Sequence, residues 1–166
     1  MADDQQGIAY AECMQAELRE EHDRRRALDG RARDVHLLSG SALGLVAAGG
    51  TLILGKDFRL TPSAGGAFAF AFLFLLVSLV FALIGSNLAQ YKVATVGTLK
   101  AMLSHDHWAD DPVTARYTVA TLQLGTIETL RAGNNLKATY VQSALQFQGM
   151  GLGLIAVSFG LAVAGI

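Results

Sequence analysis

Five residues within the segment 105–111 carry groups that can bind a metal ion. They are His105, Asp106, His107, Asp110 and Asp111. Imidazole together with carboxylate suits zinc or another borderline divalent ion, but this spacing matches no defined site. Asp111 followed by Pro112 is also typical of a helix start, with the aspartate as N-cap and the proline as the first helical residue. We therefore predict a structural loop and no metal site.

Catalytic motifs are missing from the sequence. No serine lies with a base at a recognisable turn, and no glycine-rich loop precedes Lys and Ser or Thr. Those arrangements support nucleophilic catalysis and phosphate binding in the common enzyme classes. We predict no catalytic residue, no cofactor and no enzymatic activity.

A basic cluster is the main candidate for ligand binding. It consists of Arg24, Arg25, Arg26, Arg31 and Arg33. In one interpretation these side chains anchor the chain to anionic lipid headgroups, at about 1 kcal/mol for each residue. In the other they form a pocket for a phosphate together with Arg131 and Lys137, because guanidinium groups bind phosphate oxygens in pairs. The residues alone leave both interpretations open.

The chain that must position these groups is strongly apolar. Of its 166 residues 52% are hydrophobic and 16% are charged, and Cys13 is its single cysteine. This composition excludes a disordered chain, an ordinary soluble enzyme and a disulfide scaffold. Segments 37–55, 60–91 and 138–166 contain no Asp, Glu, Lys or Arg. Each is long enough to cross a bilayer, since a spanning helix needs roughly 20 apolar residues.

We therefore predict an all-α membrane protein with three transmembrane helices and long cytoplasmic helical extensions. The expected parts are a juxtamembrane helix in 1–36, a transmembrane hairpin in 37–87, a cytoplasmic helical pair in 88–137 and a third transmembrane helix in 138–166. The spans themselves are expected at 37–55, about 62–85 and about 144–166. A proton-coupled transporter is disfavoured, because such proteins need an ionisable group inside the membrane.

Lysine and arginine residues predict the orientation in the membrane. Segments 1–36 and 88–137 together hold eleven of them, whereas the loop between the first two spans holds Lys56 and Arg59. Positive charges near the ends of spans stay in the cytoplasm. We expect a cytoplasmic amino terminus and a carboxyl terminus on the other side of the membrane. The segment before residue 37 lacks the features of a cleaved signal.

Three long helices are expected around the spans. Residues 4–35 predict a helix that continues into the first span, but Glu21 and Arg25 interrupt its apolar stripe. This favours a solvated helix over a coiled coil. Apolar spacing in 88–103 predicts that the second span also continues into the cytoplasm. Residues 112–166 predict one helix on the order of 80 Å long, which reaches from the cytoplasm through the third span.

Small and amide residues mark possible contacts between spans. Gly40 and Gly44 lie one turn apart in the first span, as do Gly149 and Gly153 in the third. Such pairs permit close approach of two helices, although glycine is also frequent in membrane helices generally. Gln142 and Gln146 share a face of the third span. They could hydrogen-bond between helices, or they could line a polar opening when several subunits assemble.

The order of these parts resembles that of the small membrane proteins known as Pycsar effectors of bacterial antiphage defence. Asp29-Gly30-Arg31-Ala32 resembles the Asp-x-Lys-Ala motif of that family, with Arg31 in place of the usual lysine, and Asn134-Asn135-Leu136-Lys137 resembles its Asn-x-x-Lys motif. The resemblance implies an effector in the bacterial inner membrane. It also implies that the cytoplasmic helices sense a cyclic pyrimidine nucleotide, after which the spans disrupt the membrane.

Two hypotheses follow. The first is a non-enzymatic, self-associating membrane effector whose ligand site includes Arg24, Arg25, Asp29, Arg31, Arg131, Asn134 and Lys137. Its expected partners are the lipid bilayer, further copies of itself, and a cyclic nucleotide or a cytoplasmic protein, but no nucleic acid polymer. The second is a structural or accessory subunit that docks on a larger membrane complex.

Overall fold

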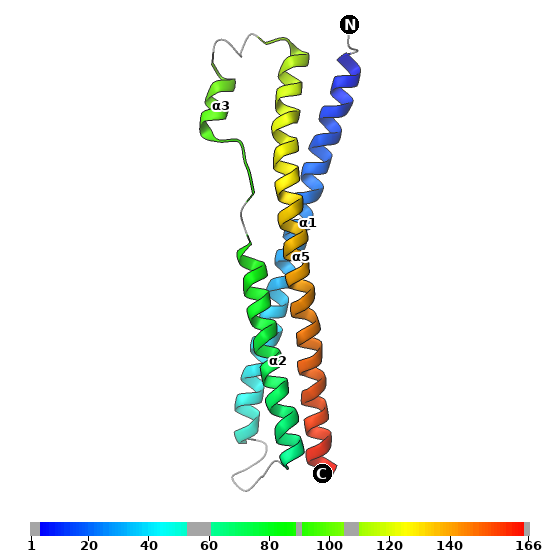
Figure 1. Ribbon diagram of the computed structural model, residues 1–166, viewed down its shortest axis with the longest axis vertical. Helices are drawn as coiled ribbons and strands as arrows, with labels where there is room; N and C mark the ends of the chain where they lie inside the picture. The colour runs from blue at the N-terminus through cyan, green and yellow to red at the C-terminus, as the bar shows by residue number, and fades with distance from the viewer. Residues whose placement is uncertain (1–3, 53–60, 89–90, 105–109, 165–166) are drawn as a thin grey trace. The chain divides into compact units, whose positions relative to one another are not determined.

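The structure is a computed structural model that describes residues 4–52, 61–88, 91–104 and 110–164. All secondary structure in these residues is α-helical, as the sequence predicts (Figure 1). The helices are α1 (Asp4–Leu52), α2 (Pro62–Asn87), α3 (Val96–Met102) and α5 (Pro112–Ala164). The chain folds into two units, and both α1 and α5 contribute to each. The first, here called the polar unit, comprises 1–27 and 89–135, and the second, the apolar unit, comprises 28–88 and 136–166.

The helix starts follow from local sequence. Thr61 caps α2 by accepting a hydrogen bond from the backbone N–H of Ala64, and Pro62 is the first helical residue. Asp111 caps α5 by accepting hydrogen bonds from the N–H groups of Val113 and Thr114, at 2.9 and 3.1 Å. Both capping residues supply an acceptor for amides that lack a partner within the helix. The predicted helix start at Pro112 and the single long helix that follows are confirmed.

The predicted continuation of the second span into 88–103 is wrong. Helix α2 ends at Asn87, residues 91–95 are not helical, and α3 is a separate short helix. Thr95 caps α3 by accepting from the N–H of Thr98, and the N–H of Lys92 donates to the hydroxyl of Thr129 on α5. These hydrogen bonds satisfy backbone groups outside a helix, so the apolar spacing alone does not extend α2.

Helix α5 shows a regular pattern of burial. Its buried residues are Ile127, Leu130, Asn134, Lys137, Val141, Ala144, Gln148, Gly151 and Ser158. Most of these positions alternate in steps of three and four, which is the repeat of coiled-coil packing. Helix α1 follows the same repeat at Leu28, Ala32, Val35 and Ser39. The stripe predicted to be solvated in 4–35 is therefore a packed face, with Glu21 buried on it at 4% exposure.

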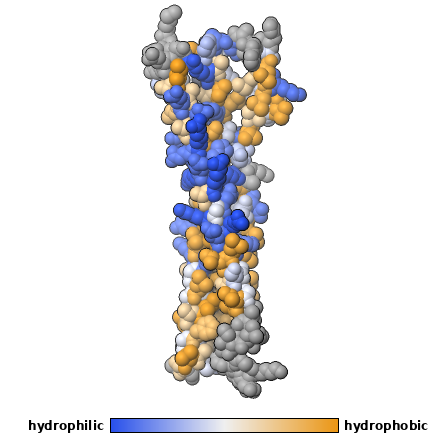
Figure 2. Space-filling model, turned by 180° about the vertical axis from the view of Figure 1, so that it is seen from behind, coloured by the Kyte–Doolittle hydropathy of each residue, from blue (hydrophilic) through white to orange (hydrophobic). Residues whose placement is uncertain are grey.

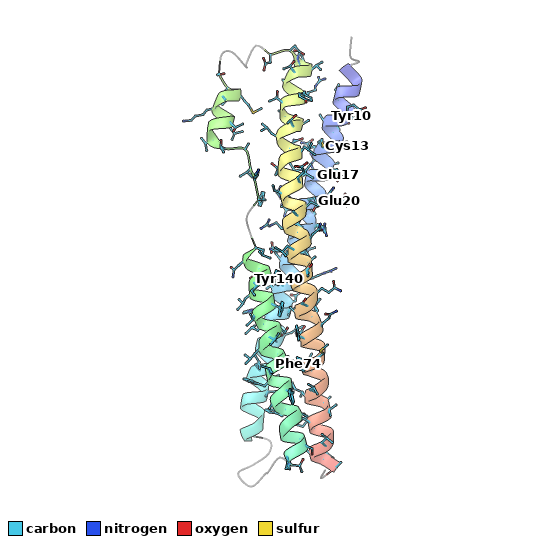
Figure 3. All side chains as sticks on the ribbon, in the orientation of Figure 1. Tyr10, Cys13, Glu17, Glu20, Phe74 and Tyr140 are labelled. Atoms are coloured by element: carbon cyan, nitrogen blue, oxygen red, sulfur yellow. The ribbon has the colours of Figure 1, made fainter. Side chains whose placement is uncertain are left out.

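In the apolar unit, α2 lies alongside α5 and the second half of α1 (Figure 1). Val35, Ala82 and Ala144 form a buried core with Phe81 packed against it. The rings of Phe74 and Phe81 on α2 stack against Phe147 on α5, with centroids 5.9 and 5.5 Å apart. Figure 3 shows Phe74 and Tyr140 on these two neighbouring helices.

Small polar groups join the three helices of the apolar unit. The hydroxyl of Ser78 donates to the carbonyl of Ala144 at 2.7 Å and lies 3.2 Å from the hydroxyl of Ser39. Ser158 donates to the carbonyl of Ala64 at 2.8 Å. A buried hydroxyl needs such a partner, because an unpaired one is costly in an apolar environment. These bonds fix which residues of α1, α2 and α5 lie at the same level.

Two of the described helices, α2 and α5, contain an apolar stretch long enough to cross a membrane. Only 22% of that stretch in α2 and 17% in α5 is buried, whereas the core helix of a soluble protein is mostly buried. Figure 2 shows hydrophobic side chains over the visible face of the apolar unit. The first predicted span, 37–55, forms the end of α1 as far as Leu52, and the rest of it lies outside the described residues. That segment 37–55 crosses the membrane, in addition to α2 and α5, stays a prediction.

Candidate functional site

A charged cluster joins α1 and α5 within the polar unit. The carboxylate of Glu21 accepts a hydrogen bond from Nε of Arg131 at 2.7 Å and another from Nδ2 of Asn134 at 2.9 Å. A terminal nitrogen of Arg131 donates to Glu17 at 2.7 Å. We call Glu17, Glu21, Arg131 and Asn134 the charge cluster. Figure 3 shows Glu17 on the α1 segment beside α5.

The charge cluster favours an ionised Glu21. Burial raises the pKa of Glu21, but the hydrogen bonds from Arg131 and Asn134 and the charges of Arg131 and Arg24 outweigh it, so that the pKa lies below its ordinary value. The same carboxylates raise the pKa of Arg131, with the hydrogen bond to Glu21 as the main cause. The pair is therefore fully charged at neutral pH.

Asn134 is buried completely and is oriented by its partners. Its Nδ2 donates to both the backbone carbonyl and the carboxylate of Glu21, each at 2.9 Å. Since both partners are acceptors, only the nitrogen can face them, which settles the orientation of the amide. The Oδ1 atom of Asn134 is buried and has no hydrogen-bond partner among the described residues.

Two further arginines belong to the predicted ligand site. Arg24 lies at the edge of the charge cluster, and Arg25 lies apart from it. Arg24 donates to Oδ1 of Asn135 at 2.8 Å and lies 3.7 Å from the carboxylate of Glu21. Arg25 instead covers the ring of Tyr91, with its guanidinium carbon 5.0 Å from the ring centroid. Such a cation–π contact adds on the order of 0.5–1 kcal/mol at an exposed site. Arg25 thus joins the segment after α2 to α1.

The other members of the predicted site lie in the apolar unit. Lys137 is 1% exposed, yet its ammonium group pairs with the carboxylate of Asp29, whose side chain is 48% exposed. The whole lysine side chain occupies a core position of α5, and its buried charge is compensated by the half-exposed carboxylate of Asp29. Arg31 is exposed on the neighbouring surface of α1.

The structure thus divides the seven predicted ligand residues into separate groups. Arg24, Arg131 and Asn134 lie together in the polar unit, and Asp29 pairs with Lys137 in the apolar unit. Sequence reasoning missed Glu17 and Glu21 as the acceptors that hold Arg131. The available signal was Glu21 itself, a carboxylate on the stripe of α1 that is apolar apart from Glu21 and Arg25.

Anion binding is the chemistry that the charge cluster can support. Arg131 is about half exposed, with 49% of its side chain accessible, so an anion can reach it from solvent. Two of its five N–H donors already bond Glu17 and Glu21, so a phosphate that binds the guanidinium competes with these carboxylates for its charge. A separate groove of about 230 Å³ lies between α1 and α5 in the same unit, lined by Ile8, Ala11, Glu12, Gln15, Arg116, Val119 and Gln123. None of the predicted ligand residues lines it.

The predicted packing and amide residues point away from the helix contacts of the apolar unit. Gly40, Gly44, Gly149 and Gly153 have open space around them, since no described atom lies within 4 Å of where a Cβ would stand. Gln142 and Gln146 are exposed. Two described glycines do contact another helix, namely Gly85, against Tyr140 and Val141, and Gly151, against Leu75. The buried amide of the apolar unit is Gln148, whose Nε2 has no partner among the described residues.

Of the candidate metal ligands, His105, Asp106 and His107 lie outside the described residues. Asp111 is described, and it serves as the cap of α5. The described part of the chain holds no group of three or more His, Cys, Asp or Glu side chains that could bind a metal ion.

Comparison with protein-family models, with curated proteins and with solved structures finds no match to this chain.

Proposed function

We propose that this chain is a non-enzymatic, self-associating integral membrane protein that perturbs its membrane when the polar unit binds an anionic ligand. The large apolar surface of α2 and α5 supports the membrane location, because most of it is not covered by protein. The distribution of Lys and Arg supports a cytoplasmic polar unit. The short motifs around Asp29 and Asn134 support a defence effector of the bacterial inner membrane and a cyclic pyrimidine nucleotide as the ligand.

The burial of Glu21 within the charge cluster carries this proposal. A buried ion pair contributes little net stability compared with apolar packing, whereas removal of one partner is strongly destabilising. A phosphate that takes Arg131 would leave the carboxylate of Glu21, at 4% exposure, with only the amide of Asn134 and the more distant Arg24 to compensate its charge. The favoured response is for α1 to move away from α5 until Glu21 is hydrated. The charge cluster is thus a contact that an anion can open.

Helix continuity supports a route from the charge cluster to the spans. Both α1 and α5 run without interruption from the polar unit into the apolar unit. A change in the packing of their first halves therefore acts on the same two helices whose second halves contact α2. The proposed outcome is a rearrangement of the apolar unit that lets small solutes cross the membrane.

A second candidate function is an accessory subunit of a larger membrane complex. The outward glycines of α1 and α5 favour it, because they leave room for a helix of another protein. This function requires no ligand and no change in permeability. Purification from membranes with a different protein bound would support it over the effector.

Dye release from vesicles tests the effector function. The purified protein is placed in lipid vesicles that contain a fluorescent dye, and cyclic cytidine or uridine monophosphate is added. We expect nucleotide-dependent release. In the variant Glu21→Gln, release should be strongly reduced even where the nucleotide binds Arg131, because no buried carboxylate is left to drive α1 away from α5. The matched control is Glu20→Gln, which removes the same charge from the neighbouring, exposed position (Figure 3).

Two results would contradict the proposal. Vesicles that stay intact with every cyclic nucleotide would remove the effector function. Equal nucleotide-dependent dye release by Glu21→Gln and Glu20→Gln would show that release does not depend on the charge cluster.

A further inference from the structure

One face of α5 in the apolar unit carries amide and small residues and points directly away from α1 and α2. It consists of Gln142, Gln146, Gly149, Gly153, Ala156 and Gly160, and all six are exposed. Their spacing alternates between four and three residues, like that of the buried positions Val141, Ala144, Gln148 and Gly151. We call these six residues the outer stripe.

The two amides of the outer stripe lie deep in the apolar segment. Ser78 donates to the carbonyl of Ala144, so these residues share one level. Nine residues separate Ser78 from the end of α2 at Asn87, which is roughly 13 Å at about 1.5 Å per residue. Gln146 lies a further half-turn from that end. Neither glutamine side chain has a hydrogen-bond partner among the described residues, and lipid tails offer none.

The outward face of α2 differs from the outer stripe. Many of its exposed residues are large and apolar, and they include Phe70, Leu73, Leu76, Val80 and Leu83 at 38–60% exposure. Such a surface suits lipid. The outer stripe instead combines unpaired amides with glycines around which no described atom lies within 4 Å of a Cβ position. Amides and small residues together are typical of contacts between membrane helices.

We propose that a second copy of this chain binds the outer stripe of α5 and that Gln142 and Gln146 hydrogen-bond with the same residues of that copy. All copies share one orientation in the membrane, so a two-fold axis along the membrane normal brings equal residues together at equal depth. A glutamine amide holds both a donor and an acceptor and can therefore pair with another glutamine. Gly149 and Gly153 allow the two helices to approach closely. This inference rests on the proposed membrane location and names the surface for self-association.

Disulfide crosslinking tests the contact. In a Cys13→Ser background, Gln146→Cys places one cysteine on the outer stripe, and native membranes are then treated with an oxidant. We expect a disulfide-linked dimer, because the symmetric arrangement places each cysteine opposite its own copy. The matched control is Leu76→Cys, which lies at the same level on the outward face of α2. It should stay monomeric. Equal crosslinking of both variants, or none at Gln146→Cys, would overturn the proposal.

Association in vesicles gives a second, independent measurement. Energy transfer between labelled copies is followed while the vesicles are diluted with lipid. The double variant Gln142→Leu and Gln146→Leu should weaken association about tenfold, since each interhelical hydrogen bond in a membrane contributes modestly. Gly149→Leu should abolish it without harm to the fold, because open space surrounds Gly149. Unchanged association in both variants would exclude this surface.

Failure of this proposal is distinguishable from failure of the proposed function. Crosslinking needs no ligand and no dye release, so a dimer through the outer stripe could be found in a protein that never permeabilises a membrane. Conversely, nucleotide-dependent release with no crosslink at Gln146→Cys would leave the effector function standing and remove the outer stripe as the contact.

Discussion

The substitution Gly151→Ala tests how closely α2 and α5 pack. Gly151 is buried, and a Cβ atom there would lie 2.8 Å from Cγ and 3.0 Å from Cδ2 of Leu75. It would also lie 3.1 Å from the carbonyl oxygen of Ala71. Carbon atoms in contact prefer separations of about 3.5–4.0 Å. Leu75 is 0% exposed and cannot turn away into open space, so α2 or α5 has to shift.

The expected cost follows from two opposing terms. An added methyl group in a well-packed core destabilises by about 1–3 kcal/mol, whereas alanine favours a helix over glycine by about 1 kcal/mol. Gly151→Ala should therefore lower the free energy of unfolding by up to about 2 kcal/mol. Gly149→Ala is the matched control, because it gains the same helix propensity in open space. The control should be neutral or more stable by about 1 kcal/mol.

Unfolding in mixed micelles provides the assay. Purified variants are titrated with a denaturing detergent and followed by the helical circular dichroism signal. Leu75→Val should rescue Gly151→Ala, because it shortens the side chain that the new methyl group meets. The double-mutant cycle should give a favourable coupling of about 1 kcal/mol or more. Equal stability of Gly151→Ala and Gly149→Ala, or a coupling near zero, would refute the close packing of these helices.

Three further predictions concern buried polar groups. The folded-state pKa of Glu21 is lowered, so the stability that Glu21 contributes is present above about pH 4.5 and is lost as the pH falls through the lowered value. Thermal unfolding between about pH 3 and pH 6 should therefore depend less on acid in Glu21→Gln than in Glu20→Gln. Gln148→Leu should stabilise the protein by about 1 kcal/mol in the micelle assay, because it removes a buried unpaired donor. A loss of stability in this variant would mean that the amide of Gln148 has a hydrogen-bond partner. Lys137→Met should change stability by less than about 1 kcal/mol, since the half-exposed Asp29 stays hydrated, whereas Lys137→Ala should cost about 2 kcal/mol through the cavity it leaves.

The helices were predictable where one local signal dominates. Asp111 and Pro112 specify the start of α5, and the long apolar run after Pro62 specifies α2. The end of α2 was not predictable in this way, because 91–95 leaves the helical path for contacts with distant residues. One of these is the hydrogen bond from Lys92 to Thr129, and spacing within 88–103 carries no information about it.

The candidate site was predictable in its residue types and not in its pairing. Cationic side chains near the apolar segments indicated anion binding, and Arg131 and Lys137 are among them. Their acceptors depend on which turn of α1 faces which turn of α5, and that register is a tertiary property. A shift by one turn would give Arg131 a different carboxylate among the several on α1. The outward placement of Gly149 and Gly153 was equally open, because equal spacing serves a contact within or between subunits.

The proposed membrane location gives the polar groups of the apolar unit a specific role in helix packing. In water, burial of apolar side chains would hold α1, α2 and α5 together, but in lipid that driving force between helices is largely lost. Specific contacts must then select the arrangement. They include the ion pair of the buried Lys137 with Asp29. They also include the Ser39, Ser78 and Ala144 group and the bond from Ser158 to Ala64. The bonds made by the three serines involve no charged group, so each can break and re-form at modest cost. These uncharged bonds can re-form when α1 and α5 change their contact, whereas the ion pair of the buried Lys137 with Asp29 resists a separation of these two helices.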